Sequence, residues 1–169
     1  MEKVLRVLNR MEKDGIIRKY CIGGGIATVF YIEPLLTYDI DIFFIPSQEN
    51  QKITSLSPIY EYLRKKGYKI EKEHIMIEGV PVQFIPVYNN LIKEAVENSA
   101  EIRFKNIKTK VLKVEYLIAI MLQTFRPKDR ERVLRILEET EINRKYLNEI
   151  LKRHNLKKKF EKFLKNMKE

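Results

Sequence analysis

Two groups of residues near the N-terminus have types and spacing that suit phosphate and metal chemistry. Three glycines, Gly23–Gly25, open an apolar segment, and glycines at a helix N-terminus leave backbone N–H groups free to meet an anion. Asp39 and Asp41 then alternate with Ile40 and Ile42, and the period of two puts both carboxylates on one face of a strand. Two adjacent acids beside a phosphate-binding turn predict a magnesium site.

These residues require a strand that leads into the glycines, a short helix after them and a strand that carries the acids. The hydrophobic pattern predicts these elements and extends them along the whole chain. Expected strands cover residues 16–22, 39–45, 68–72, 74–77, 80–87, 101–104 and 110–114. Expected helices cover residues 1–14, 25–32, 53–66 with a start near 58, 89–98, 115–125, 128–139, 143–154 and 156–167.

One polar residue stands out in the expected strand 80–87. Gln83 is the only polar side chain among its eight residues. A polar group at the centre of an apolar strand must find a hydrogen-bond partner. Gln83 therefore marks either a satisfied core amide or part of a site.

Composition favours a globular protein that stays in the cytoplasm. The chain has 169 residues, 44% hydrophobic and 33% charged, which suits one compact domain with a helical appendage. We expect an α/β core over residues 1–114 and a C-terminal helical extension over 115–169. No apolar run approaches the length of a membrane span, no amphipathic stretch favours membrane attachment, and the charged N-terminus does not resemble a secretory signal.

Positive charge is concentrated in the C-terminal part of the chain. The formal net charge is +10; residues 1–104 carry 14 Lys+Arg and 14 Asp+Glu, whereas residues 105–169 carry 19 and 9. A basic C-terminal third suits a polyanionic partner or a nucleotide. The alternative is a solvated helical surface that is rich in lysine.

The glycines, the acid pair and the later strand together resemble the nucleotidyltransferase-fold superfamily, which includes DNA polymerase β. That motif is a glycine pair, a gap, and then Asp-apolar-Asp. Thirteen residues separate Gly25 from Asp39, which lies at the long edge of the usual gap. Within the superfamily, residues 31–34 and 37–41 are similar to small prokaryotic proteins related to AbiE-type toxins. The resemblance covers about residues 15–135.

This resemblance implies a small mixed β-sheet flanked by helices, with a C-terminal helical extension. It also implies Mg²⁺ or Mn²⁺ on Asp39 and Asp41, an NTP as substrate, and catalysis by the same two acids with Gln83 at the position of the expected third carboxylate. Acceptors could be RNA or a protein, and a toxin–antitoxin partner could exist. The nucleotide-binding residues would be Gly23, Gly24, Gly25, Thr37, Arg126 and Lys128.

Departures from the family pattern leave three functional hypotheses open. Gln83 removes a negative charge and cannot act as a base, and Met121 and Arg132 stand where relatives often have Lys and an acid. The chain could be an active nucleotidyltransferase, a catalytically impaired nucleotide-binding module, or a nucleic-acid-binding adaptor. Near the basic segment, Arg126 could bind phosphates or be a surface charge, and Lys128 could bind substrate or pair locally with Asp129.

Overall fold

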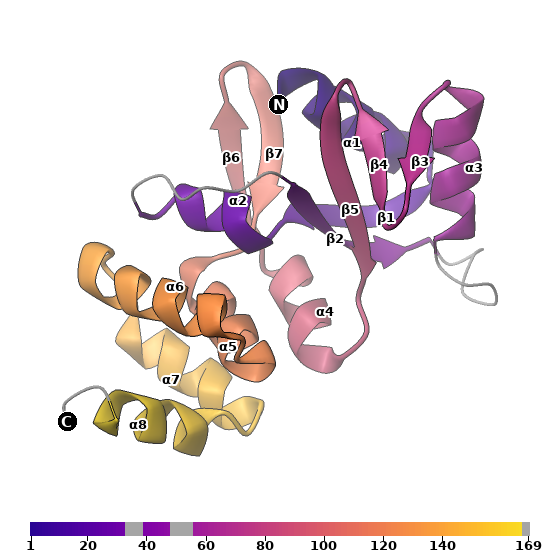
Figure 1. Ribbon diagram of the computed structural model, residues 1–169. Coiled ribbons are helices and arrows are strands. Elements are labelled where there is room, and N and C mark those ends of the chain that lie inside the picture. The colour runs from indigo at the N-terminus through magenta and orange to yellow at the C-terminus, as the bar shows by residue number, and fades with distance from the viewer. Residues whose placement is uncertain (33–38, 48–55, 167–169) are drawn as a thin grey trace.

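The computed structural model describes residues 1–32, 39–47 and 56–166, and within these ranges helices alternate with strands (Figure 1). The helices are α1 (Glu2–Lys13), α2 (Gly24–Val29), α3 (Ser57–Lys65), α4 (Asn90–Glu97), α5 (Val114–Thr124), α6 (Pro127–Glu139), α7 (Arg144–Arg153) and α8 (Lys157–Lys165). The strands are β1 (Ile17–Ile22), β2 (Ile40–Pro46), β3 (Lys69–Glu71), β4 (His74–Ile77), β5 (Val80–Pro86), β6 (Ala100–Phe104) and β7 (Ile107–Val111).

The described strands form one seven-stranded sheet in the order β3-β4-β5-β2-β1-β7-β6. β2 is parallel to β5 and β1 is parallel to β7, while the other neighbours are antiparallel. The prediction of a mixed sheet flanked by helices is therefore confirmed. β2 is the middle strand of this order, and Ile40, Ile42 and Phe44 along it are almost completely buried.

Helix α5 connects the sheet region with the C-terminal helices. Every residue from Val114 to Leu122 is buried, as expected for a helix that is mostly apolar on all sides; the buried acid in this run, Glu115, accepts a hydrogen bond from the Asn143 backbone N–H at 3.1 Å. α5 packs against α2 and α4 on one side and against α6 and α7 on the other. Figure 1 shows α6, α7 and α8 stacked beside it, away from the strands. Although α5 is apolar, none of the helices within the described ranges has the length and hydropathy needed to cross a membrane.

The last strand lies earlier in the chain than its predicted position, so the expectation of a strand over residues 110–114 is wrong. β7 spans Ile107–Val111, and Val114 already belongs to α5. Lys105 adopts a positive φ of 53°, which allows a tight turn between β6 and β7. The turn starts β7 early enough for Ile107, Thr109 and Val111 to alternate toward the core. Helix α3 similarly begins at Ser57, and residues 53–55 of the predicted helix lie outside the described part of the chain.

A carboxylate on α4 holds the C-terminal helices against the core. Glu94 accepts a hydrogen bond from the Tyr116 hydroxyl at 2.8 Å and from Arg153 Nη2 at 2.6 Å, and His154 Nε2 lies 2.8 Å from its other oxygen. Burial alone would raise the pKa of Glu94, but the bonds from Arg153, Tyr116 and His154 outweigh it and lower the pKa. The ionised side chain therefore stabilises the fold.

We expect Glu94→Gln to lower the free energy of unfolding by about 1–3 kcal/mol at neutral pH. Because the folded-state pKa of Glu94 lies below its unfolded value, this contribution is present above the unfolded pKa and is lost as pH falls through the folded pKa. Urea unfolding at several pH values would measure it, with the exposed Glu61→Gln as the control. If the difference in the free energy of unfolding between the native protein and Glu94→Gln persists unchanged in strong acid, this role of Glu94 is wrong.

Candidate active site

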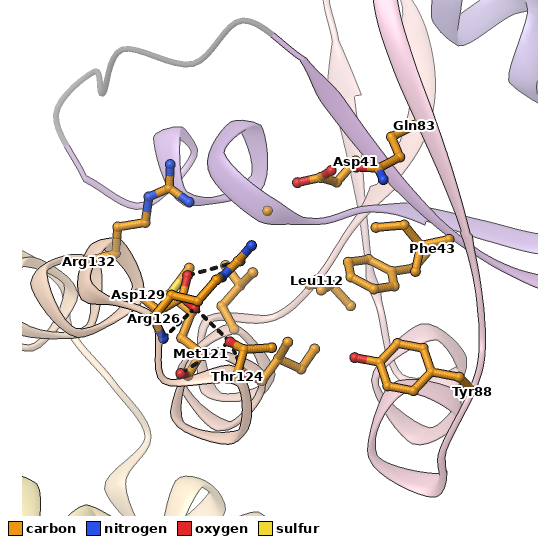
Figure 2. A pocket seen from close by; sticks show the side chains of 14 residues that line it. Asp41, Phe43, Gln83, Tyr88, Leu112, Met121, Thr124, Arg126, Asp129 and Arg132 are labelled. Carbon is orange, nitrogen blue, oxygen red and sulfur yellow. Dashed lines mark hydrogen bonds and ion pairs between the residues drawn. The ribbon is translucent and has the colours of Figure 1, made fainter. Parts of the chain in front are cut away.

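The central strand β2 places Asp41 directly opposite Gln83 of β5. The two strands are parallel, and their register pairs Asp41 with Gln83, so both side chains emerge on the same face of the sheet. Figure 2 shows them side by side at the rim of a pocket. The two residues that the sequence singled out on separate strands are thus neighbours in space.

Two of the glycines approach β2 so closely that a side chain would not fit. Gly24 has a φ of +55°, and a Cβ atom there would overlap the carboxylate of Asp41. A Cβ atom on Gly23 would overlap the ring of Phe43, and the Gly23 N–H donates to the Asp41 carbonyl oxygen at 2.9 Å. Gly25 is buried in α2. The glycines therefore hold the start of α2 against the acid-bearing strand.

A pocket of about 400 Å³ opens between this strand and the helices α5 and α6. Its acidic side carries Asp41, and the guanidinium groups of Arg126 and Arg132 face that carboxylate from the opposite side (Figure 2). Between these polar sides lies an apolar surface. The pocket is lined by Gly24, Asp41, Phe43, Gln83, Ile85, Tyr88, Leu112, Leu117, Ile120, Met121, Thr124, Arg126, Asp129 and Arg132.

A buried aspartate fixes the orientation of Arg126. Asp129 is only 1% exposed and accepts two hydrogen bonds from the Arg126 guanidinium, at 2.8 Å from Nε and 3.1 Å from Nη2. It also accepts from the Thr124 hydroxyl at 2.7 Å and from the Arg126 backbone N–H at 3.1 Å, which caps α6. Asp129 thus caps α6, but its ion-pair partner is Arg126, so the alternative in which Lys128 pairs locally with Asp129 is wrong.

The positions of these residues at the start of α6 explain why Asp129 pairs with Arg126 and not with Lys128. Lys128 lies one residue before Asp129 on α6, and adjacent helical residues point in different directions. Arg126, three residues before Asp129, lies on the same side of the helix start and can form two parallel bonds. Burial raises the pKa of Asp129, but the bonds from Arg126 and Thr124 outweigh this effect and lower the pKa. Arg126 in turn has a raised pKa, chiefly because of its bond to Asp129.

Asp41 is held in an environment that disfavours its charge. Burial raises its pKa, and the nearby carboxylate of Asp39 raises it further. Lys128, Arg126 and Arg132 act in the opposite direction, yet the net shift is upward. A cation bound beside Asp41 would favour the charged form of this carboxyl group.

Asp39 lies just before β2 and is not among the pocket-lining residues. Its Oδ2 atom lies 3.4 Å from Nε2 of His74, at the start of β4. Because Ile75 pairs with Val82, continuing this register places His74 beside Gln83. No sequence pattern predicts His74 as a site residue; the signal that could have found it is the turn at Gly79, which folds β4 back along β5.

Two other residues bear on the comparison between the site predicted from the sequence and the pocket in the structure, Thr37 and Tyr88. Thr37 lies outside the described residues. Tyr88 was not predicted as a site residue, yet it lines the pocket with 59% of its surface exposed. Nothing in its sequence neighbourhood distinguishes it, because it follows β5 in an ordinary strand-to-helix connection.

The oxygen donors beside the pocket fit a hard cation such as Mg²⁺. Asp41 and the adjacent Gln83 amide supply oxygens next to each other, and Asp39 contributes a second carboxylate nearby. Across the part of the chain that the structure describes, no three Asp, Glu, His or Cys side chains are grouped to hold a metal ion. Mg²⁺ is commonly bound through one or two carboxylates plus substrate phosphates and water. The donor set therefore suits an ion that is shared with a phosphate ligand.

Comparison with known structures identifies the class of fold. An antigenic nucleotidyltransferase-like protein from Paracoccidioides brasiliensis has a similar structure, with a TM-score of 0.57 and 16% sequence identity over 80% of this chain and 74% of that one. The chain therefore has a nucleotidyltransferase-like fold, as the resemblance predicted. No protein-family model and no curated protein matches the sequence.

Proposed function

We propose that this protein is a metal-dependent nucleotidyltransferase that moves NMP from an NTP to a hydroxyl acceptor. The observation that carries the proposal is the position of Asp41, opposite Gln83 and against Gly24, at the rim of a pocket with two arginines on its other side. The similarity of the fold to a nucleotidyltransferase-like protein supports the same class of activity. Mg²⁺ or Mn²⁺ as the cofactor and a cytoplasmic location belong to this proposal.

The two halves of the pocket suit the two halves of a nucleotide. Phosphates placed near the backbone of Gly24 would meet Arg126, whose guanidinium is already oriented by Asp129. A base placed in the apolar half would contact Phe43 and Leu117, with Tyr88 at the entrance. The chain would thus hold the nucleotide in one orientation, with its phosphates beside Asp41.

Asp41 and Asp39 would hold the metal, with Gln83 as an added oxygen donor. When bound, the metal would help to deprotonate the acceptor hydroxyl and neutralise the charge of the leaving pyrophosphate. Arg126 and Arg132 would add positive charge on the opposite side of the pocket. The remaining contribution of the protein is positioning.

A transfer assay tests this proposal. The purified protein would be incubated with each α-labelled NTP, Mg²⁺ or Mn²⁺, and RNA, protein or small-molecule hydroxyl acceptors. We expect label to appear on one acceptor class and transfer to stop when EDTA removes the metal. If label never leaves the nucleotide with any acceptor or metal, while the protein is folded, the proposed activity is wrong.

A nucleotide-binding module without turnover is the second candidate, and the residue that favours it is Gln83. The amide stands opposite Asp41, where the resemblance implies a third carboxylate. Gln83→Glu restores a negative charge at that position and separates the candidates. If the protein is an active enzyme, the native protein already transfers NMP. If it is a binding module, the native protein binds NTP without transferring NMP, and Gln83→Glu creates metal-dependent transfer.

Asp129→Asn should weaken nucleotide binding through Arg126. The change removes the charge that holds the guanidinium, so we expect about a tenfold higher Kd for NTP and about 1–3 kcal/mol less stability. Isothermal titration calorimetry and urea unfolding would measure the two effects. The control is Glu161→Gln, which breaks an exposed ion pair with Lys157 and should change neither quantity appreciably. Unchanged NTP affinity in Asp129→Asn would show that Arg126 does not bind the nucleotide.

A further inference from the structure

A second hollow lies on the other side of α6 from the candidate active site. It has a volume of about 610 Å³, and most of its lining surface is apolar, with contributions from Phe125, Leu134 and Phe163. Asp129 and Arg132 of α6 face the active-site pocket, whereas Arg130 and Leu134 of the same helix face this hollow. We call it the α6–α8 groove, because α6 and α8 supply most of its lining.

Three cations, Arg130, Lys159 and Lys162, line the groove beside its aromatic side chains. Lys159 Nζ lies 4.4 Å from the centre of the Phe125 ring, and Arg130 Cζ lies 5.4 Å from it. Phe163 packs edge-on against Phe125 with ring centres 5.8 Å apart. Within the described ranges, no carboxylate forms a salt bridge with any of the three cations. Their charge is therefore available to an anionic ligand.

The charge around the groove suits a polymer with one negative charge per unit. Helix α8 carries five lysines and one glutamate in nine residues, and Glu131 is the one acid among the described residues that line the groove. A single nucleic-acid strand matches both the cations and the aromatic rings of the groove. Its phosphates can pair with cations along α8 while a base stacks on an aromatic ring. An acidic segment without aromatic residues, such as polyglutamate, would match the charge but offers no ring to place against Phe125.

The turn between α5 and α6 connects the groove with the active-site pocket. Thr124 and Arg126 line the pocket, while Phe125 between them lines the groove. Phe125 ends α5 in a left-handed conformation, with φ 54° and ψ 29°. The two cavities are therefore separated by about the thickness of one helix, roughly 10 Å.

We propose that the α6–α8 groove binds the single-stranded nucleic acid that serves as acceptor. The strand lies along α8, where one base takes the place of the Lys159 ammonium against the Phe125 ring and the displaced ammonium pairs with a phosphate. The strand then passes the α5–α6 turn so that its terminal hydroxyl reaches the pocket beside Asp41. The choice of acceptor rests on the proposed nucleotidyltransferase function, whereas strand binding by the groove does not.

Fluorescence anisotropy with labelled U-rich RNA and T-rich DNA strands of about 15 nucleotides tests the proposal. We expect binding that weakens steeply between about 50 and 200 mM salt. Lys159→Gln/Lys162→Gln should lower the slope of log affinity against log salt by about 1.4, because two phosphate contacts are lost. Phe125→Leu should lower affinity about tenfold without changing that slope.

The matched control removes two exposed cations elsewhere. Arg64→Gln/Lys65→Gln alters α3, which lies at the opposite end of the molecule from α8 (Figure 1). We expect its strand affinity to stay close to that of the native protein. A loss as large as that of the α8 pair would overturn the groove as the site, and so would an absence of binding at about 50 mM salt. Tighter binding of RNA or of DNA supports the proposal and identifies the acceptor.

Two further measurements separate the alternatives. If polyglutamate of matched charge displaces RNA as well as unlabelled RNA does, the groove is a site for an acidic protein and the proposal is overturned. NTP affinity measured by calorimetry should be unchanged in Lys159→Gln/Lys162→Gln. If the native protein binds RNA in the groove but binds no NTP, strand binding stands and the proposed transferase function fails.

Discussion

Replacing Asp41 with asparagine is expected to lower NMP transfer by about a thousandfold or more, equivalent to about 4 kcal/mol of activation free energy. Asparagine keeps the shape of the side chain but removes the charge that would hold the metal beside the nucleotide phosphates. The effect should exceed that of any other isosteric change in the pocket, because the other acid among its described lining residues, Asp129, is already paired with Arg126, whereas Asp41 lies against Gly24 where the metal would bind. Initial rates of label transfer would measure it.

Stability separates a chemical role of Asp41 from a structural one. Burial and the neighbouring Asp39 raise the pKa of Asp41, so its charged form is less favourable in the folded protein than in the unfolded chain. Asp41→Asn should therefore have a Tm equal to or above that of the native protein. Asp14→Asn, at the end of α1, is the control and should retain full transfer. Transfer that survives in Asp41→Asn would exclude Asp41 from the chemistry.

Gly24→Ala is expected to have the second largest effect, on the fold and the site together. Its positive φ of 55° strains any L-residue, and the added Cβ atom overlaps the carboxylate of Asp41. Strain and overpacking together should lower the free energy of unfolding by roughly 2–5 kcal/mol. The displaced Asp41 should also abolish NTP binding in the fraction of protein that remains folded.

Gly79→Ala provides the matched control for Gly24→Ala. Gly79 has a positive φ of 78° in the turn before β5, but no atom lies within 4 Å of where its Cβ atom would be. Gly79→Ala should therefore lower the free energy of unfolding only by the strain contribution, roughly 1–2 kcal/mol, and should keep the native NTP affinity. Thermal unfolding and calorimetry on both variants would compare them. Equal losses in the two variants would contradict the close approach of Gly24 to Asp41.

Local patterns in the sequence were enough to predict the strands that carry Asp41 and Gln83, whereas the class of fold was predicted from the resemblance to the nucleotidyltransferase-fold superfamily. Alternation around Asp41 and the apolar run around Gln83 are local signals, and both segments are strands in the structure. The glycines were predicted to bind phosphate, but the structure adds a second reason why glycine is required at these positions. Gly23 and Gly24 lie against Phe43 and Asp41, a contact between segments that no local pattern reveals.

The remaining features depend on contacts between distant or irregular segments. The partner of Asp129 is decided by the geometry of the α6 start, where Arg126 can form two bonds and Lys128 cannot reach the same side. The contact between His74 and Asp39 depends on how β4 folds onto β5. The start of β7 depends on a turn at Lys105, a residue type that does not signal a positive φ.

The most direct test of the proposed site is a crystal structure with Mn²⁺ and a non-hydrolysable analogue of the NTP that binds most tightly. We predict a triphosphate between the Gly24 backbone and Arg126, with anomalous density from Mn²⁺ at the Asp41 carboxylate. A nucleotide bound outside this pocket, or Mn²⁺ bound with the nucleotide but away from Asp41, would contradict it.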